Sequence, residues 1–368
     1  MASCPLLTQS GRGQGQPDHF QGASLTRYDA RSELGGKQMR RREFITLLGG
    51  VASWPLGARA QQHDAPRRIG VLMGFVEHDR EGEADAAAFV EGLAALNWKE
   101  GNNLRIDWRW GDSDPTLMER YAAELVALSP DLLLAGSSSL ATDVLRRRTE
   151  KIPIVFANVT EPVGQGFVAS LGHPGANVTG FSNYDPVMVS KWLGMLTQLT
   201  PPVANVGALY NPATTPYAPL LLHAIDESAP SLSVAVRAAT VKDDADIELE
   251  IAALAREERS GLLVLPDIFN NAHRDTIIAL AARYRLPAVY PFRFWAAAGG
   301  LMSYGIEISD TFRRSTVYVD RILKGAVPAD LPVQTPINFK AVINLRTAKA
   351  IGFTIPPTLL VAADEVLE

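Results

Sequence analysis

From Arg68 onward, short apolar runs alternate with amphipathic segments, and this alternation constrains the fold more than any other feature of the chain. The runs have the length of β-strands, whereas apolar residues between them recur at helical spacing. Helices that connect parallel strands cover both faces of the resulting sheet. The sequence therefore predicts an α/β fold in which parallel sheets are covered by helices.

The alternation is expected to occur twice, in two Rossmann-like lobes. Strands of the first lobe are predicted at residues 69–75, 104–110, 131–135, 152–157 and 177–182, with helices near 85–97, 116–128 and 139–148. After Pro186 the pattern restarts, with strands predicted at 205–210, 232–238, 261–266, 287–290 and 300–304 and helices near 187–199, 215–228, 246–259 and 272–284. Strict alternation in the run at 104–110 predicts a half-buried edge strand rather than a surface for nucleic acid.

The C-terminal part of the chain is expected to cross back between the two lobes. It contains a predicted helix near 308–324, the Pro-rich segment 331–339 and a short helix near 345–351. Hinge crossings are expected near 183–187, 303–308 and 332–340. On this division the first lobe holds residues 66–184 plus 305–332, and the second lobe holds residues 185–304 plus 333–368.

An export signal is predicted at residues 39–60. Three arginines precede an apolar stretch over 44–56, and Ala58 and Ala60 are small residues suited to cleavage after Ala60. The pair Arg41-Arg42 favours the twin-arginine route, while the general secretory route stays open. The apolar stretch is shorter than the roughly 20 residues of a membrane-spanning helix. The cleaved protein is therefore expected to be free in the periplasm, with no stable membrane insertion.

Residues 1–38 are polar and show no apolar periodicity. They are expected to form a disordered extension, or to reflect a start codon that was assigned too early, with the true start at Met39.

Charge and cysteine content exclude several kinds of partner. The chain has 35 Lys and Arg residues and 40 Asp and Glu residues. Residues 1–60 contain eight of the basic residues and four of the acidic ones. The mature part therefore keeps 27 basic and 36 acidic residues. This acidic balance argues against nucleic acid and anionic membrane surfaces as partners. The single cysteine, Cys4, lies in the extension, and the mature histidines are scattered without metal-ligand spacing. We therefore expect no disulfide, no metal and no cofactor.

Candidate ligand-binding residues of the first lobe follow two predicted strands. They are Ser137, Ser138 and Ser139 after the run at 131–135, and Asn158, Thr160 and Glu161 after the run at 152–157. The three serines open a predicted helix, where hydroxyls and free backbone N–H groups can hold a carboxylate. Simple helix capping is the alternative role for the serines, and a solvated loop position or a local cap is the alternative for the other three.

The second lobe offers corresponding residues at and beyond its strand ends. They are Tyr210, Asn211, Asp267, Asn270 and Tyr290. Ligands of open α/β sheets bind outside the carboxyl ends of the strands, so residues of both lobes are expected to converge on one cleft. Asp267 is the candidate partner of a ligand amine, because a carboxylate in a partly dry cleft makes a charge-assisted hydrogen bond. A solvated loop position or a local cap is the alternative for each residue, and packing against the hinge is the alternative for Tyr290.

No catalytic constellation accompanies these residues. The G-x-S-x-G nucleophile elbow fails at Leu140, and no histidine is placed as an evident base. The segment Gly164-Gln165-Gly166 is not a dinucleotide fingerprint, because Ala169 stands where the third glycine belongs. The sequence therefore predicts no catalytic residues.

Several long motifs together resemble one known family. They are FVEGLAALNWKEGNNLRIDWRW, IPIVFANVTEPVGQGFVASLGHPGANVTGF, GLMSYG, YVDRILKGAVPADLPVQTPINFKAVINLRTAKAIGFTIPPTLL and ADEVLE. With the signal RRREFITLLGG, they make the chain after Met39 similar to the tryptophan/tyrosine-type group of ABC-transporter substrate-binding proteins.

This resemblance implies a type I periplasmic binding fold, in which two lobes joined by three crossings close on a small ligand. It implies delivery of the ligand to a membrane permease with its ATPase, and it implies no catalysis. By analogy with amino-acid binders of this fold, the serines and the segment 157–161 would hold a ligand carboxylate, while acidic and aromatic groups of the second lobe hold the amine and side chain. Members of the group usually carry Asp-Pro where this chain has Glu161-Pro162, which leaves the ligand open.

Two other classes of function stay open from the sequence. One is an exported two-domain enzyme that uses the cleft between the lobes, and the other is a ligand-sensing domain that presents its closed form to a membrane receptor. Turnover of a substrate would favour the first class, and a neighbouring kinase gene would favour the second.

Overall fold

The computed structural model describes residues 65–368 of the chain. The predicted extension at 1–38, the export signal at 39–60 and the cleavage site after Ala60 lie outside the described residues. None of the helices in residues 65–368 combines the length and apolar character needed to cross a membrane.

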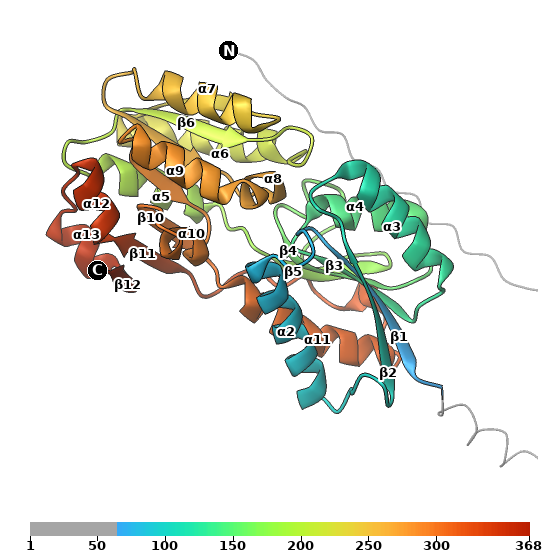
Figure 1. The fold of residues 1–368 in the computed structure, drawn as a ribbon. Helices are drawn as coiled ribbons and strands as arrows, with labels where there is room; N and C mark the ends of the chain where they lie inside the picture. The colour runs from blue at the N-terminus through green and yellow to red at the C-terminus, as the bar shows by residue number, and fades with distance from the viewer. Residues whose placement is uncertain (1–64) are drawn as a thin grey trace, which may run out of the picture. The chain divides into compact units, whose positions relative to one another are not determined.

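The first lobe is built on a sheet of parallel strands in the order β2-β1-β3-β4-β5. The strands are β1 (Arg67–Met73), β2 (Leu104–Trp110), β3 (Leu132–Gly136), β4 (Ile154–Val159) and β5 (Val178–Ser182). Figure 1 shows α2 (Arg80–Ala95) and α11 (Ile308–Leu323) on one face of this sheet, and α3 (Pro115–Ala127) and α4 (Ser139–Arg148) on the other. The predicted edge strand is confirmed, because Leu104 and Ile106 in β2 are buried while Arg105 is exposed.

The second lobe is built on a sheet with the order β12-β11-β10-β9-β8-β6-β7. Its strands are β6 (Asn205–Tyr210), β7 (Ala235–Thr240), β8 (Ser260–Val264), β9 (Ala288–Tyr290), β10 (Met302–Gly305), β11 (Lys340–Asn344) and β12 (Glu365–Leu367). Its helices are α5 (Val187–Thr197), α6 (Ala218–Ser228), α7 (Asp244–Leu254), α8 (Ile268–Ala272), α9 (Arg274–Arg283), α10 (Arg293–Ala297), α12 (Leu345–Ile351) and α13 (Pro357–Ala362), with the 3₁₀ turn η1 (Ala229–Leu232). A second 3₁₀ turn, η2 (Pro328–Asp330), follows α11 and contacts β5 of the first lobe. All neighbouring strands are parallel except β10 and β11, which pair antiparallel.

The chain passes between the two sheets three times. It does so between β5 and α5, between β10 and α11, and between η2 and β11. The predicted fold class, two parallel-sheet α/β lobes with three crossings, is therefore confirmed, with the antiparallel β11 as an addition. The residue boundaries assigned to the lobes stay predictions.

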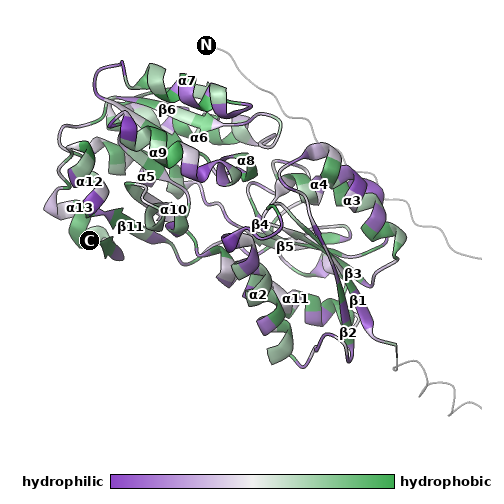
Figure 2. Cartoon of the chain, viewed as in Figure 1, coloured by the Kyte–Doolittle hydropathy of each residue, from purple (hydrophilic) through white to green (hydrophobic). Residues whose placement is uncertain are grey.

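The cores form where the sequence pattern places apolar residues. Trp192 on α5 and Trp295 on α10 are fully buried, and each donates its indole N–H, to the carbonyl of Tyr304 and to the side-chain oxygen of Asn271 respectively. In Figure 2, hydrophobic residues gather along the strands and hydrophilic residues lie on outer helices such as α3. Burying an indole while satisfying its N–H is how a tryptophan contributes most to a core.

Several helices begin at the side-chain caps that their sequences offer. Asp79, Asp114, Ser138 and Asp243 each accept a backbone N–H of the following first turn, and Pro115 occupies the first position of α3. These caps satisfy N–H groups that have no partner within the helix. The predicted strand at 232–238 begins later, at Ala235, because the 3₁₀ turn η1 and a left-handed Ser233 precede it.

Candidate ligand-binding site

A small polar cavity lies where strand ends of the two sheets face each other. Its volume is about 20 Å³. Its lining comes from both lobes: Ser137, Ser138, Ser139, Asn158, Thr160, Asn183, Thr214, Tyr217, Pro266, Asp267, Ile268, Asn271 and Phe292. The predicted convergence of residues from both lobes therefore occurs for Ser137, Ser138, Ser139, Asn158, Thr160 and Asp267.

The serine segment forms one wall at the N-terminus of α4. Ser137 adopts a left-handed conformation with φ of 55°, and the Ser138 hydroxyl accepts the N–H of Ala141 at 3.0 Å. The first backbone N–H groups of the helix, at Ser139 and Leu140, have no acceptor within the helix. They point out of the helix end with its partial positive charge, which is an arrangement that attracts anions.

Gln165 holds the serine segment to the end of β4. Its side-chain amide donates to the Ser139 hydroxyl at 3.0 Å and also to the carbonyl of Thr160. Gln165 was not among the predicted site residues, so this positioning role was missed.

The end of β4 contributes amide and hydroxyl groups to the cavity. Asn158 has a φ of 70°, and its buried Oδ1 has no hydrogen-bond partner among the described residues. The Thr160 hydroxyl donates to Oδ1 of Asn183 at 2.8 Å. A buried acceptor without a partner is costly, so Asn158 is suited to receive a donor from a ligand.

Asp267 forms the acidic part of the opposite wall. Its carboxylate accepts the N–H of Asn211 at 2.9 Å, the hydroxyl of Thr214 at 2.6 Å and the N–H of Phe269 at 3.0 Å. Burial raises the pKa of Asp267 to about 6, although these donors oppose the rise by favouring the charged form. The residue therefore caps α8 and also presents a carboxylate to the cavity.

Aromatic residues support this wall from behind. Tyr290 stacks on Trp295 with 4.9 Å between ring centroids, and Trp295 donates to Asn271, which lines the cavity. The hydroxyl of Tyr217 donates to the carbonyl of Pro266 at 2.6 Å. Both contacts fix side chains of the second lobe relative to Asp267.

Five predicted site residues do not line the cavity. They are Glu161, Tyr210, Asn211, Asn270 and Tyr290. Asn211 lies behind Asp267, its side-chain oxygen accepting the N–H of Ala213, while Asn270 donates to the carbonyls of Leu209 and Leu265. Tyr290 is buried in the core, where its ring stacks on Trp295.

Glu161 and Tyr210, the other two residues outside the cavity lining, lie in different surroundings. Glu161 has a φ of 48°, and burial without a cationic partner raises its pKa. Tyr210 ends β6, where its carbonyl accepts the N–H of Val241 in the loop after β7.

Several functional candidates were missed from the sequence. Asn183 follows β5, so the rule of strand carboxyl ends could have found it. Asp85 gave no such signal, because it lies within α2. Its buried carboxyl accepts the Ser137 hydroxyl at 3.1 Å, and burial raises the pKa of Asp85 well above its usual range.

The lobes contact each other around the cavity. Arg274 on α9 forms an ion pair with Asp79 at the start of α2, with 3.0 Å between Nη1 and Oδ2. The hydroxyl of Ser113 donates to the carbonyl of Ile268 at 3.1 Å, and the side chain of Leu220 on α6 packs against Gly164. The structure is therefore a closed arrangement of the two lobes.

We expect Arg274→Met to shift the protein toward an open arrangement. The side chains of Arg274 and Asp79 are only 17% and 10% exposed, so their attraction is less screened than that of a surface pair. If the free energy that favours the closed arrangement falls by about 1 kcal/mol, the ratio of open to closed protein rises roughly fivefold. Small-angle scattering of the ligand-free protein should show a larger radius of gyration.

The control for this change is Arg283→Met on the same helix. Arg283 pairs with Glu248 within the second lobe, and both side chains are largely exposed. Its substitution should leave the radius unchanged, and equal radii for the two variants would contradict a closing role for Arg274.

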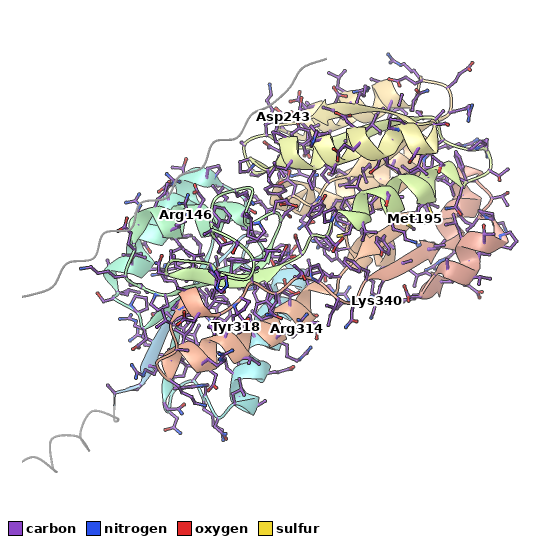
Figure 3. The ribbon with its side chains drawn as sticks, turned by 180° about the vertical axis from the view of Figure 1, so that it is seen from behind. Arg146, Met195, Asp243, Arg314, Tyr318 and Lys340 are labelled. Carbon is purple, nitrogen blue, oxygen red and sulfur yellow. The ribbon has the colours of Figure 1, made fainter. Side chains whose placement is uncertain are left out.

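Larger hollows elsewhere lack the convergence of strand ends. One of about 330 Å³ lies at the hinge crossings, where Arg314 and Lys340 line it (Figure 3). Among residues 65–368, no group of three or more histidine, cysteine or acidic side chains could hold a metal ion.

Two α/β lobes, three crossings and a polar cavity between strand ends define a binding protein of the type I periplasmic fold. The chain belongs to the ABC transporter substrate-binding protein family, whose sequence profile matches residues 68–367. The predicted family is therefore confirmed.

Relatives and solved structures support this assignment. A tyrosine-binding protein of Clostridioides difficile is 25% identical over 286 residues, which cover 77% of this chain and 81% of the relative. The structure of an ABC domain from Streptococcus pneumonia in complex with L-Trp has a TM-score of 0.76 and 26% identity, covering 82% of this chain and 100% of its own. The structure of a conserved domain protein from Vibrio cholerae has a TM-score of 0.75 and 28% identity, covering 82% of this chain and 99% of its own.

Proposed function

We propose that this protein is the periplasmic binding component of an ABC importer, and that it binds an amino-acid-like ligand between its lobes. The proposal rests on one observation: groups that attract an anion and a group that attracts a cation face each other across one cavity. A helix N-terminus with hydroxyls faces it from the first lobe, and a buried carboxylate faces it from the second lobe. A zwitterion complements both walls.

The ligand carboxylate would lie against the N-terminus of α4. The free N–H groups of Ser139 and Leu140 and the serine hydroxyls can donate to it. The side chain of Gln165 holds Ser139 in place for this contact. Because these donors are positioned before binding, little ordering cost accompanies the contact.

The ligand ammonium would lie against Asp267. The three donors already bonded to this carboxylate fix its orientation. An ammonium group adds a charge-assisted hydrogen bond and removes the penalty of burying the negative charge alone.

The relatives support the class of ligand. One is named for binding tyrosine and one was solved with L-Trp. We propose the same general class, an amino acid, for this chain, with delivery to a membrane permease and its ATPase and with no chemical turnover. Export to the periplasm is proposed on the signal-like sequence at 39–60.

A thermal-shift screen of the purified protein against the amino acids tests the proposal. A ligand at 100 times its Kd adds about 2.7 kcal/mol to native-state stability, which raises the Tm by a few degrees. A shift with one or several amino acids supports the proposal. An unchanged Tm across the full set, at millimolar concentrations, would contradict it.

Ligand affinity should fall on acidification. Asp267, with its pKa of about 6, is ionised at pH 7.5 and protonated at pH 5, so the attraction for an ammonium group is present above the pKa and lost below it. We expect Kd, measured by calorimetry, to be about tenfold higher at pH 5 than at pH 7.5. In Asp267→Asn the same comparison should show little change, and an equal pH dependence in both proteins would assign it to another group.

A further inference from the structure

We infer that Ile268 limits the ligand to amino acids with small polar side chains, an inference that rests on the proposed function. The residue belongs to the second lobe but fills space beside the serine segment of the first lobe. It thereby limits the size of the cavity next to the anion-binding serine segment.

The side chain of Ile268 packs into the first lobe. It is 6% exposed and belongs to the apolar cluster that contains Met118 and Ala135, both from the first lobe. A Cβ atom built on Gly74 would lie 3.0 Å from Cγ2 of Ile268 and 2.8 Å from Cβ of Ser138. Ile268 therefore sits directly over the bare backbone of Gly74, next to Ser138.

The backbone of Ile268 is fixed as firmly as its side chain. Its carbonyl accepts the hydroxyl of Ser113 at 3.1 Å, and it directly follows Asp267, whose carboxylate is held by three donors. The backbone of Ile268 therefore follows the position of Asp267. The proposed ammonium anchor and the wall that limits size therefore move together.

The rest of the cavity suits a polar side chain. Hydroxyl, amide and carboxylate groups make up most of the lining, and its apolar side chains are Pro266, Ile268 and Phe292, apart from the ring of Tyr217. The buried Oδ1 of Asn158 calls for an N–H or O–H donor. A ligand side chain with a hydroxyl or amide supplies such a donor, whereas a hydrocarbon leaves the acceptor without a partner.

An aromatic side chain does not fit the closed arrangement. The cavity of about 20 Å³ holds little more than one water molecule, so any ligand widens it. A small ligand requires a slight separation of the walls. An indole or phenol ring would have to displace Ile268 or separate the lobes enough to break the Arg274 to Asp79 ion pair.

Calorimetric titration of the intact protein with serine, asparagine, tyrosine and tryptophan tests this inference. In the wild-type protein we expect serine or asparagine to bind at least 100-fold more tightly than tryptophan. Ile268→Ala should reduce this ratio at least tenfold by admitting the ring, and Ile268→Val, which disturbs folding less, should reduce it by a smaller factor.

Leu220→Ala is the matched control. Leu220 also bridges the lobes, through Gly164, but it does not line the cavity. This change should weaken all ligands alike and leave the ratio between serine and tryptophan unchanged.

The outcomes separate this inference from the proposed function. Tighter wild-type binding of tryptophan or tyrosine than of serine and asparagine would overturn the role of Ile268 and leave amino-acid binding standing. If the ratio between the affinities for serine or asparagine and for tryptophan were unchanged in both Ile268 variants, the role of Ile268 would likewise be overturned and amino-acid binding would stand. Failure of the wild-type protein and all variants to bind any of the four would overturn the inference. The same failure together with an unchanged Tm across the full set of amino acids would overturn the proposed function as well.

Discussion

Asp267→Ala is expected to weaken binding of an amino-acid ligand by about 100-fold or more. Removing one partner of a buried charge pair costs about 2–5 kcal/mol, because the ammonium group is then buried without a counter-charge. Calorimetric titration with the ligand found by the thermal-shift screen measures this loss. Asp267→Asn should recover part of the hydrogen bonding but not the charge, so its affinity should lie between those of Asp267→Ala and wild type.

Asp243→Ala is the control for the structural part of this change. Like Asp267, Asp243 caps the helix that follows it, α7, and accepts the N–H of Asp246 at 3.0 Å (Figure 3). Loss of such a cap costs about 1 kcal/mol of stability. We expect Asp243→Ala to lower the Tm with no change in Kd. If Asp267→Ala behaved in the same way, Asp267 would be a helix cap alone.

Gly305→Ala is expected to destabilise the protein by about 3 kcal/mol or to prevent folding. Gly305 ends β10, where the chain leaves for the second hinge crossing, and it pairs with Lys340 of β11. A Cβ atom at this position would overlap the backbone carbonyl of Pro291. Because the strand is held by pairing on its other side, the backbone cannot retreat from the overlap. Chemical denaturation, with the midpoint as readout, measures the effect.

Gly194→Ala provides the matched comparison. Gly194 lies inside α5, and an added Cβ atom would meet only the distant side chain of Gln198, at 3.8 Å. Alanine is better than glycine in a helix by about 0.8–1.0 kcal/mol, so this variant should be more stable than wild type. A similar loss of stability in both variants would show that the overlap with Pro291 is not the cause.

Much of the fold could be predicted because strand and helix periods are local properties. The bounds of β2, α4, β6 and α12 agree with the predicted ranges, since each has strict alternation, a side-chain cap or turn residues at its ends. The strands β11 and β12 were not predicted. They are short and lie in a Pro-rich tail, and they become strands only because β10 offers an edge for pairing.

The candidate site could be predicted in part by one topological rule. Polar residues after parallel strands meet at one edge of a sheet, and that rule placed Ser138, Asn158 and Asp267 at the cavity. The same rule also selected Asn270, whose side chain turns back to the strand carbonyls. The direction of a side chain beyond the strand depends on the turn that follows, which the strand pattern does not contain.

The sequence by itself determined the two parallel-sheet lobes, the three crossings and the strand ends from which the site is built, because periodicity and capping act between near neighbours in the chain. Only the tertiary structure decided which of those residues face one another. Ile268 packs over Gly74, and Asp85 reaches Ser137 from within a helix, through contacts between segments far apart in sequence. Such contacts depend on how the lobes close, and they set the size and polarity of the cavity.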